Sequence, residues 1–259
     1  MLEVSNARKV FYRGKPDEKI ALNDLSLKLG TGEFGIIIGS NGAGKSTMLN
    51  AVSGALPLDS GSVVVGNQDV TNLPVHKRAA IITRVFQAPM KGTAASMTIA
   101  ENMLLAELRD KTRRLRPGLT AARREKYREH LSVLGLGLED RLDARMDLLS
   151  GGQRQSVSLV MAVSTSPQLL LLDEHTAALD PRTADLVMTA TVKAVEAFKL
   201  TVLMVTHNMQ HAIDYGHRVF MLDAGRVKLE IGPDEKKGLT VPDLISHFST
   251  KTDRMLLAS

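Results

Sequence analysis

The period of the hydrophobic pattern changes twice along the chain, from strand-like to helical and back. Near the N-terminus, residues 2–11 and 20–29 favour strands, and the wholly apolar run 34–38 is typical of a buried parallel strand. Residues 98–165 then show helical spacing. Strand-like runs return at 169–172, 201–205, 219–222 and 227–231. Strands that alternate with helices predict an α/β fold with a helical insertion.

Capping and breaking residues indicate where several helices begin and end. Thr98 and Glu101 have the spacing of a capping box, and Pro181 suits the first turn of a helix. Helical spacing also covers residues 119–134, where glycines end it. Residues 241–248 predict a short amphipathic helix, to which we assign no chemistry.

Composition excludes several classes of protein. The chain has 259 residues, 44% of them hydrophobic, which is ample for a buried core. It has no cysteine, so disulfides and thiolate metal sites are absent. The N-terminal residues lack a basic segment followed by an apolar one, and no apolar run approaches the ~18 residues of a membrane helix. We therefore expect a soluble chain whose membrane role would come through a partner.

Positive charge is concentrated in one stretch. Between Arg109 and His130, nine Lys and Arg residues stand against three Asp and Glu, whereas the whole chain carries +5. We interpret the stretch as a solvated helical face, with attraction to anionic lipid headgroups or an acidic partner loop as the alternative. Nucleic acid is not expected as a partner, because the chain has six Phe, three Tyr and no Trp for base stacking.

A glycine-rich segment with the pattern G-x-x-x-x-G-K-[ST] lies between the apolar run 34–38 and a helix expected over 45–54. Its glycines let backbone N–H groups turn inward, and the helix N-terminus adds its dipole, so the segment suits the phosphates of a nucleoside triphosphate. Lys45 supplies a charge for the β- and γ-phosphates, and the Ser46 hydroxyl can ligate Mg²⁺. The candidate binding residues are Gly39, Ser40, Asn41, Gly42, Ala43, Gly44, Lys45, Ser46 and Thr47. The alternative is a turn that binds nothing, and the complete pattern argues against it.

Two carboxylates, Asp173 and Glu174, follow a run of four leucines at 169–172. A buried strand there would end at the edge where ligands bind in open α/β sheets. We expect Asp173 to hold Mg²⁺. Glu174, which points elsewhere because strand side chains alternate, is expected to act as general base for an attacking water. A solvated pair that caps the next helix is the alternative.

Three further features gain weight from their order along the chain. The pentapeptide Leu-Ser-Gly-Gly-Gln contains Ser150, Gly151, Gly152 and Gln153. A helix that begins there can approach a γ-phosphate. Gln87 follows a strand-like stretch, and His207 follows the strand expected at 201–205. Alone, each of these two would be interpreted as a polar loop residue or a structural histidine.

The glycine-rich segment, Gln87, the pentapeptide, the acidic pair and His207 together resemble the motif series of the ATP-binding-cassette (ABC) ATPases. The resemblance covers roughly residues 2–231 and points to the nucleotide-binding subunit of an ABC transporter. It implies a P-loop NTPase core with a mixed sheet, an N-terminal antiparallel β-subdomain and an inserted α-helical subdomain. It also implies ATP and Mg²⁺ as cofactors, bound in a head-to-tail dimer that encloses ATP between its two copies.

The resemblance assigns roles to the candidate residues. Lys45, Ser46 and Thr47 of one copy would bind ATP·Mg²⁺, while Ser150 and Gly152 of the other copy would contact the same γ-phosphate. Gly151 and Gln153 belong to the same candidate contact.

The resemblance also covers the residues between these motifs. Gln87 would touch Mg²⁺, the attacking water and the membrane partner. Asp180 would lie in the loop that links the two sites, and His207 would contact the γ-phosphate and orient Glu174. Glu174, His207 and Gln87 are therefore the candidate catalytic residues, and Ser46, Gln87 and Asp173 the candidate metal ligands.

Two positions stay open. Phe11 is expected to stack on adenine, with Tyr12 as the rival. His175 stands where many members of the family have proline. We interpret it as a residue of the helix entry, with a pH-sensitive contact near the γ-phosphate as the alternative.

The expected domain organisation follows from the same resemblance. Residues 1–259 would form a single ABC ATPase domain. Its catalytic core would consist of 1–87 and 166–232, its helical subdomain of 88–165, and its C-terminal tail of 233–259.

The expected function is to energise a bacterial ABC membrane transporter, an importer of a small solute such as an amino acid. The expected partners are a second copy of the chain, an integral membrane permease and, through the permease, an extracytoplasmic substrate-binding protein. The chain would then lie at the cytoplasmic face of the inner membrane as a peripheral subunit. The alternative is a non-transport cytosolic ABC ATPase in an assembly complex. A nucleotide-sensing module is a third class, against which the intact Glu174 and His207 argue.

Overall fold

The computed structural model of the chain describes residues 1–109, 111 and 117–247, and it divides into two compact units. The first unit contains Met1–Arg78 and the chain from Thr201 onward, and the second contains Ala79–Leu200. Part of the basic stretch 109–130 and the end of the expected tail 233–259 therefore lie outside the described residues. The division into a catalytic core and a helical subdomain that the sequence predicts stays a prediction.

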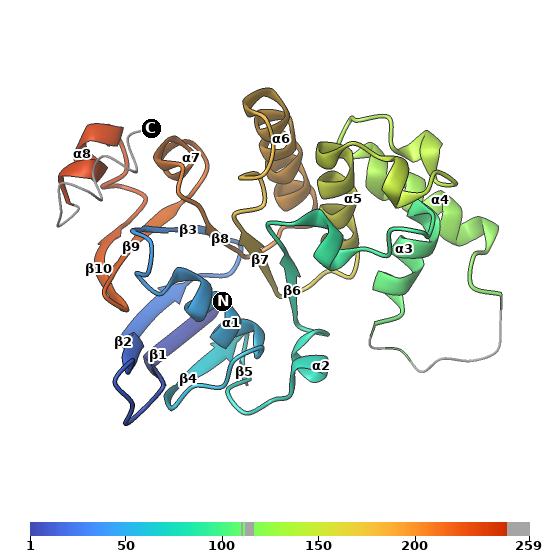
Figure 1. Ribbon diagram of the computed structural model, residues 1–259. Helices are drawn as coiled ribbons and strands as arrows, with labels where there is room; N and C mark the ends of the chain where they lie inside the picture. The colour runs from blue at the N-terminus through green and yellow to red at the C-terminus, as the bar shows by residue number, and fades with distance from the viewer. Residues whose placement is uncertain (110, 112–116, 248–259) are drawn as a thin grey trace. The chain divides into compact units, whose positions relative to one another are not determined.

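The first unit begins with a four-stranded antiparallel sheet in the order β2-β1-β4-β5, shown in Figure 1. Its strands are β1 (Leu2–Phe11), β2 (Lys19–Leu29), β4 (Ser60–Val65) and β5 (Gln68–Asp69). Residues alternate between buried and more exposed positions along β2, as the sequence pattern predicts. This sheet confirms the predicted N-terminal antiparallel β-subdomain.

Other strands of this unit lie in a mixed sheet, in the order β10-β9-β3-β8. Strand β3 pairs in parallel with β8 and β9, and β9 pairs antiparallel with β10. The strands are β3 (Phe34–Gly39), β8 (Val202–Val205), β9 (Arg218–Asp223) and β10 (Arg226–Ile231). All six residues of β3 are buried, as expected for a parallel strand inside a sheet.

The described residues of the first unit also form the helices α1 (Lys45–Ser53), α2 (Val75–Arg78), α7 (Met209–Asp214) and α8 (Val241–Ser246). Helix α8 confirms the helix expected from residue 241, and Phe248 lies outside the described residues. An arginine closes the C-terminal end of α1. The guanidinium of Arg78 is 3% exposed and donates to the carbonyls of Ala51 and Val52, and to two loop carbonyls. These bonds satisfy helix carbonyls that have no partner within the helix, and they compensate for burying the charge.

The second unit combines a parallel pair of strands with helices. Strand β6 (Ile82–Val85) pairs with β7 (Leu169–Asp173). The helices are α3 (Ile99–Glu107), α4 (Ala121–Ser132), α5 (Gly151–Val163) and α6 (Pro181–Phe198), with 3₁₀ turns at Pro89–Gly92, Glu139–Arg141 and Met146–Leu148. Thr98 and Glu101 form the predicted capping box at the start of α3. Across the described residues of both units, no helix combines the length and apolar character needed to cross a bilayer.

Candidate nucleotide-binding site

In the first unit, the glycine-rich segment turns directly from β3 into α1. Its bends lie at Gly42 and Gly44, with φ angles of 86° and 104°. A Cβ atom on Gly44 would lie 2.6 Å from the backbone oxygen of Ala21. Glycine is thus required there by both backbone conformation and space, because side-chain-bearing residues rarely adopt this φ.

The lysine of this segment is held by the segment itself. Lys45 is 7% exposed, and its Nζ donates to Gly39 O at 2.7 Å and to Ser40 O at 2.9 Å. Helix α1 has no side-chain cap at its N-cap Gly44, so the backbone N–H groups of its first turn are not occupied by a capping side chain. Ser46 is exposed in that turn and Thr47 is half-buried. A positive dipole end, an ammonium and a hydroxyl thus converge on one loop.

His207 comes from the same edge of the mixed sheet as this loop. Strand β8 lies parallel to β3, with Val205 opposite Ile37, and Thr206 N donates to Ile37 O at 3.1 Å. His207 follows at once and is exposed. The structure therefore places His207 and the glycine-rich loop at the carboxyl ends of neighbouring parallel strands.

The two candidate adenine-stacking residues differ in exposure and backbone. Phe11 is the last residue of β1 and is half-buried, whereas Tyr12 is 64% exposed with a φ of 54°. The strand before them is tied to a carboxylate, because Val10 N donates to Asp59 Oδ2 at 2.6 Å. That hydrogen bond, with the charges of Lys9 and then Arg13, lowers the pKa of Asp59. The assignment of the adenine contact stays a prediction.

In the second unit, Gln87 and Asp173 leave the same edge of the β6–β7 pair. The strands are parallel with Val85 opposite Leu172, so Gln87 and Asp173 both lie at their carboxyl ends. Gln87 is exposed. Asp173 Oδ2 accepts a hydrogen bond from Arg84 at 2.5 Å. Sequence reasoning missed Arg84, although a cation inside the short apolar strand β6 was a signal that something anionic lies beside it.

The strand ends at Asp173, and Glu174 has a φ of 45°. Alternation along a strand was expected to make Asp173 and Glu174 point in different directions. That reason is wrong, because the strand ends before Glu174. Instead, a tight turn follows the strand, with Ala177 N donating to Glu174 O at 3.0 Å. A left-handed conformation at a non-glycine residue costs on the order of 1 kcal/mol, so the surroundings must hold it.

His175 anchors that turn in the interior of the unit. It is 2% exposed, and its Nε2 lies 3.0 Å from Thr191 Oγ1 in α6. Thr191 Oγ1 donates its one proton to Val187 O at 2.7 Å, so Nε2 of His175 must be the donor in the first bond. His175 is thus a structural part of the turn that carries Glu174. No sequence signal beyond the missing proline pointed to its partner.

The pentapeptide begins α5 as expected, and Ser150 is its N-cap. Ser150 Oγ accepts from Gln153 N at 3.2 Å, while Gln153 Oε1 accepts from Ser150 N at 3.1 Å. The two side chains form a capping box. Gly152 is buried, and a Cβ there would collide with Thr183 of α6, whereas Gly151 is exposed. Gly152 therefore also serves the packing of α5 on α6.

A second glutamine of α5 connects this helix to the segment before Gln87. Gln155 is fully buried, and its Nε2 donates to Phe86 O at 3.0 Å. The same Phe86 ring lies under the Arg84 guanidinium, 4.9 Å from it. The helix of the pentapeptide and the approach to Gln87 are thus joined inside one unit. Sequence reasoning did not single out Gln155.

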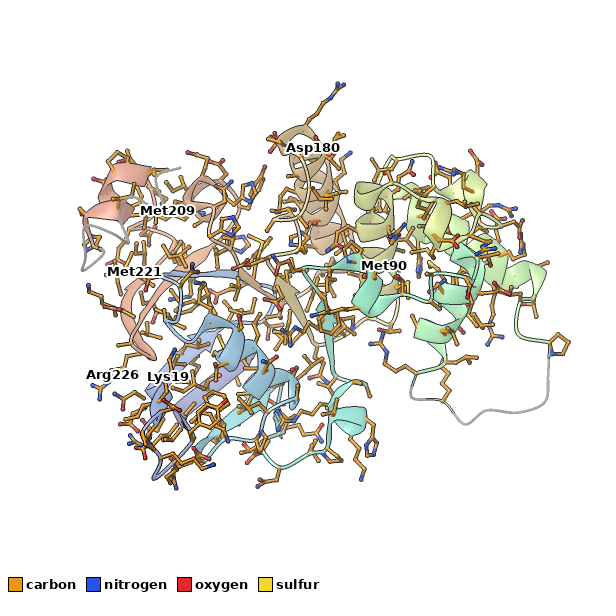
Figure 2. The ribbon with its side chains drawn as sticks, viewed as in Figure 1. Lys19, Met90, Asp180, Met209, Met221 and Arg226 are labelled. Carbon is orange, nitrogen blue, oxygen red and sulfur yellow. The ribbon has the colours of Figure 1, made fainter. Side chains whose placement is uncertain are left out.

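Asp180, which Figure 2 labels, is the N-cap of α6. Its Oδ1 accepts from Thr183 N at 3.1 Å. Hydrogen bonds from the Thr183 side chain and backbone lower the pKa of Asp180. The predicted helix start near Pro181 is confirmed, and the linking role of Asp180 stays a prediction.

The predicted site residues thus fall into two groups, one in each unit, and each group includes residues at the carboxyl ends of parallel strands. The first unit carries the glycine-rich loop and His207, and the second carries Gln87, the pentapeptide and the acidic pair. A loop built for phosphate on a mixed α/β sheet defines a P-loop NTPase.

A model of the family described as ABC transporter matches residues 22–177. The chain belongs to this family of ATP-binding cassettes, and it is an ATP-binding subunit with ATPase activity.

Relatives of known annotation cover nearly the whole chain. A tyrosine transport ATP-binding protein of Clostridioides difficile is 44% identical over 249 residues, which are 96% of this chain and 98% of the relative. A phosphonates import ATP-binding protein, PhnC of Lactococcus lactis, is 32% identical over 91% of this chain and 94% of its own. A methionine import ATP-binding protein, MetN of Corynebacterium efficiens, is 34% identical over 87% of this chain and 61% of its own.

Solved structures of cassettes have the same fold. The dimeric post-hydrolysis state of the ATP-binding cassette MJ0796, bound to ADP and Pi, is 30% identical with a TM-score of 0.75. It covers 90% of this chain and 99% of its own. The ADP conformation of the cassette MJ1267 is 27% identical with a TM-score of 0.77, covering 95% and 97%. The predicted P-loop NTPase fold is confirmed.

Proposed function

We propose that the chain hydrolyses ATP to drive a bacterial importer of a small solute, an amino acid of the aromatic kind. The observation that carries this proposal is the 44% identity to a tyrosine transport ATP-binding protein over 96% of this chain and 98% of the relative. Other relatives serve phosphonate and methionine import at 32% and 34% identity. We therefore assign the choice of substrate to membrane and extracytoplasmic partners, and ATP hydrolysis to this chain.

The proposed assembly contains two copies of the chain, a permease and a substrate-binding protein. A head-to-tail dimer brings Ser150 of one copy to the nucleotide held by Lys45 of the other. The solved dimer of a cassette 30% identical to this chain supports it. The chain would act at the cytoplasmic face of the inner membrane, docked on the permease near Gln87.

The residues present fit ATP and Mg²⁺. The first turn of α1 lacks a side-chain cap, and Lys45 lies among the loop carbonyls, so phosphate oxygens would find both backbone donors and an ammonium. Ser46 and Asp173, with Gln87, would hold Mg²⁺, which favours oxygen ligands. No group of three or more His, Cys, Asp or Glu is arranged for a metal within the described residues. Mg²⁺ needs no such group when substrate phosphates and waters complete its shell.

Within this assignment, Glu174 accepts a proton from the attacking water, and His207 orients that carboxylate. Lys45 and the first turn of α1 stabilise charge that develops on the phosphate oxygens. When bound, Mg²⁺ would add further charge stabilisation. His175 holds the turn of Glu174 through its bond to Thr191.

The first experiment tests the chemistry. Glu174→Gln is expected to lower the ATP hydrolysis rate by about 100-fold or more while ATP binding persists, because a general base contributes at least that much. Glu196→Gln, an exposed change in α6, is the matched control and should leave the rate unchanged. A Glu174→Gln chain that hydrolyses ATP at the original rate would refute the assigned role.

The second experiment tests the partners. Tagged Glu174→Gln protein with ATP and Mg²⁺ is used to capture binding proteins from detergent-solubilised membranes of the native host. A polytopic permease in the eluate supports the importer, and uptake of tyrosine by the reconstituted complex, measured against methionine and phosphonate, tests the substrate. Recovery of soluble partners alone, from protein that still dimerises with ATP, would favour a cytosolic assembly ATPase instead.

A further inference from the structure

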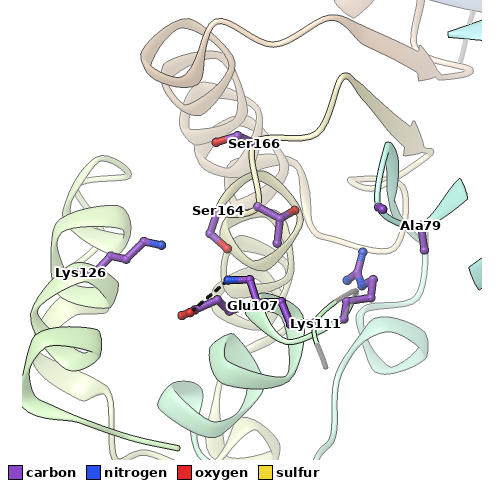
Figure 3. A pocket seen from close by; sticks show the side chains of 9 residues that line it. Ala79, Glu107, Lys111, Lys126, Ser164 and Ser166 are labelled. Atoms are coloured by element: carbon purple, nitrogen blue, oxygen red, sulfur yellow. Dashed lines mark ion pairs between the residues drawn. The ribbon is translucent and has the colours of Figure 1, made fainter. Parts of the chain in front are cut away.

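A basic pocket of about 280 Å³ lies within the second unit, away from the candidate site residues. Its polar lining comes from the end of α3, from α4 and from the turn after α5, and Figure 3 shows it at close range. The chemistry-bearing residues are Glu107, Arg109, Lys111, Lys126, Ser164 and Ser166.

This pocket lies at the opposite end of the elements that carry the ATP chemistry. Its wall includes Ala79 and Ser166, which precede the parallel strands β6 and β7, whereas Gln87 and Asp173 follow those strands. Helix α5 separates the two ends as well: its 13 residues extend roughly 20 Å, with Ser150 at the start and the turn of Ser166 beyond its end. The pocket is therefore separate from the candidate nucleotide-binding residues of this unit.

Glu107, the carboxylate that lines the pocket among the described residues, already has hydrogen-bond partners. Glu107 accepts from Tyr127 Oη at 2.7 Å and from Arg123 Nε at 3.2 Å, and Lys111 Nζ lies 3.6 Å away. Burial opposes ionisation of Glu107, but the Tyr127 hydroxyl and the Arg123 charge keep its pKa below the usual value. The Glu107 carboxylate is thus paired with Lys111 and Arg123, whereas Lys126 acts on it from beyond ion-pair distance.

Lys126 supplies a cation that lines the pocket from α4. Among residues 1–109, 111 and 117–247 no carboxylate lies within ion-pair distance of its ammonium. The charge of Lys126 also acts on His130 of the same helix. Burial is the first cause that lowers the pKa of His130, and the Lys126 charge is the second. In Figure 3 the Lys126 side chain reaches from α4 towards the turn of Ser164.

Hydroxyl groups face this cation from the turn after α5. Ser164 Oγ makes only a long bond to Met161 O, 3.3 Å, and Thr165 Oγ1 a longer one to Ala162 O, 3.4 Å. Ser166 is exposed and has a φ of 50°, which bends the chain sharply before β7. Such weakly engaged hydroxyls can turn to donate to an anion.

We propose that this pocket binds a phosphate group, carried either by a small soluble phosphorylated compound or by the headgroup of a phospholipid. Point charges from lysine and serine or threonine hydroxyls are donors that phosphate oxygens accept. A carboxylate ligand would leave part of this donor set unused, because it offers one fewer oxygen and one charge. The volume approaches that of small-ligand sites and exceeds what a single ion needs.

The test uses the full chain with a stoichiometric amount of a non-hydrolysable ATP analogue and Mg²⁺, so that the P-loop is filled up to the γ-phosphate position. Inorganic phosphate is then titrated by calorimetry. We expect saturable binding that weakens about ten-fold or more in Lys126→Gln combined with Ser166→Ala, because a charged donor is lost. Arg128→Gln is the matched control, since Arg128 is an exposed cation of the same helix and does not line the pocket.

Vesicles distinguish the source of the phosphate. The same proteins are sedimented with phosphatidylcholine vesicles that contain phosphatidic acid, and with pure phosphatidylcholine vesicles. Binding to inorganic phosphate assigns a soluble ligand, and binding only to phosphatidic acid vesicles assigns a lipid, provided that the Lys126/Ser166 variant loses it. Unchanged thermal midpoint and ATPase rate show that the variant is folded. Absence of both kinds of binding, or equal binding by the variant and the original chain, overturns the proposal.

Discussion

The loop after β3 and the turn after β7 both carry candidate phosphate chemistry, but they are held in different ways. The loop is shaped by backbone: Gly44 has a φ of 104°, and the ammonium of Lys45 rests on main-chain oxygens. The turn is shaped by side chains: Asp173 is held by Arg84, and His175 by Thr191. The partners of the turn come from other strands and helices of the same unit.

A short sequence motif can describe the loop better than the turn. A backbone shape needs particular residues at consecutive positions, because each φ angle is local. A side-chain arrangement needs partners that are distant in sequence, and several residue types can fill each place. We therefore expect substitutions in the loop to have all-or-none effects on ATP binding, and substitutions around the turn to have graded effects on hydrolysis.

The largest effect should come from Gly44→Ala. The new Cβ would lie 2.6 Å from Ala21 O, so the loop must be rebuilt and its donors redirected. ATP affinity should fall by about 100-fold or more, as expected when several charge-assisted bonds are lost together. Gly32→Ala is the control, because Gly32 also has a positive φ, 75°, but meets nothing within 4 Å. ATP affinity is measured with a fluorescent nucleotide. An equal loss of affinity in both variants would show that backbone strain, and not the shape of this loop, is responsible.

A smaller effect is expected from Gln155→Leu in the second unit. The change leaves the carbonyl of Phe86 without its donor, at a cost of about 1–3 kcal/mol, so kcat should fall by about ten-fold. KM for ATP should change little, because Gln155 is not a candidate contact of the nucleotide. Gln168→Leu, an exposed change in the same unit, serves as control. A rise in KM with unchanged kcat would contradict this positioning role.

Thr191→Val should have a graded effect of about three-fold on the hydrolysis rate. It removes the acceptor of His175 and loosens the turn of Glu174 while it keeps the side-chain volume. Thr189→Val makes the same change at an exposed position of the same helix and should have no effect. Nitrogen-15 spectra provide a direct check: His175 should carry its proton on Nε2, and a spectrum with the proton on Nδ1 alone would refute the assigned bond.

The smallest effect is expected at Asp59 in the first unit. Its carboxylate, and not a glycine, holds the end of β1 next to the candidate adenine-stacking residue Phe11. Asp59→Asn should lower the thermal midpoint by about 2 °C near neutral pH. The pKa of Asp59 is lowered by Val10 N and then Lys9, so its stabilisation is present above the unfolded pKa and is lost as pH falls through the folded value.

The difference between Asp59→Asn and the original chain should therefore begin to shrink near pH 4, where the unfolded carboxyl titrates, and vanish only below the lower folded pKa. Asp234→Asn, at a side chain that is 93% exposed, should match the original chain at every pH. A difference at Asp59 that persists unchanged in acid would show that the carboxylate charge is not its cause.

Much of the fold follows from local pattern. The strand over residues 2–11 and the capping box at Thr98 and Glu101 are where the sequence predicts them, because alternation and capping involve neighbours a few residues apart. Strand β4, Ser60–Val65, was not predicted. It begins Ser-Gly-Ser, and its place in the sheet depends on pairing with β1, which no local pattern reveals.

The candidate site divides along the same line. Its motifs in order indicated an ABC ATPase, and the family is confirmed. The turn at Glu174 was not predictable, because alternation holds only while the strand continues and this strand ends one residue earlier. Arg84, Gln155 and Thr191 have no motif, since each acts through a partner on another element.

Motifs and local pattern were enough to predict the class of protein, the candidate phosphate-binding loop and several helix starts, because these depend on the conformational limits of consecutive residues. The side chains that hold the acidic pair, and the basic pocket at the opposite strand ends, could be recognised only in the folded chain. Those features arise when residues far apart in sequence are brought within a few ångströms by the packing of helices on strands. Hydrogen bonds and charge balance act at that short range, so their partners become definite only once the chain has folded.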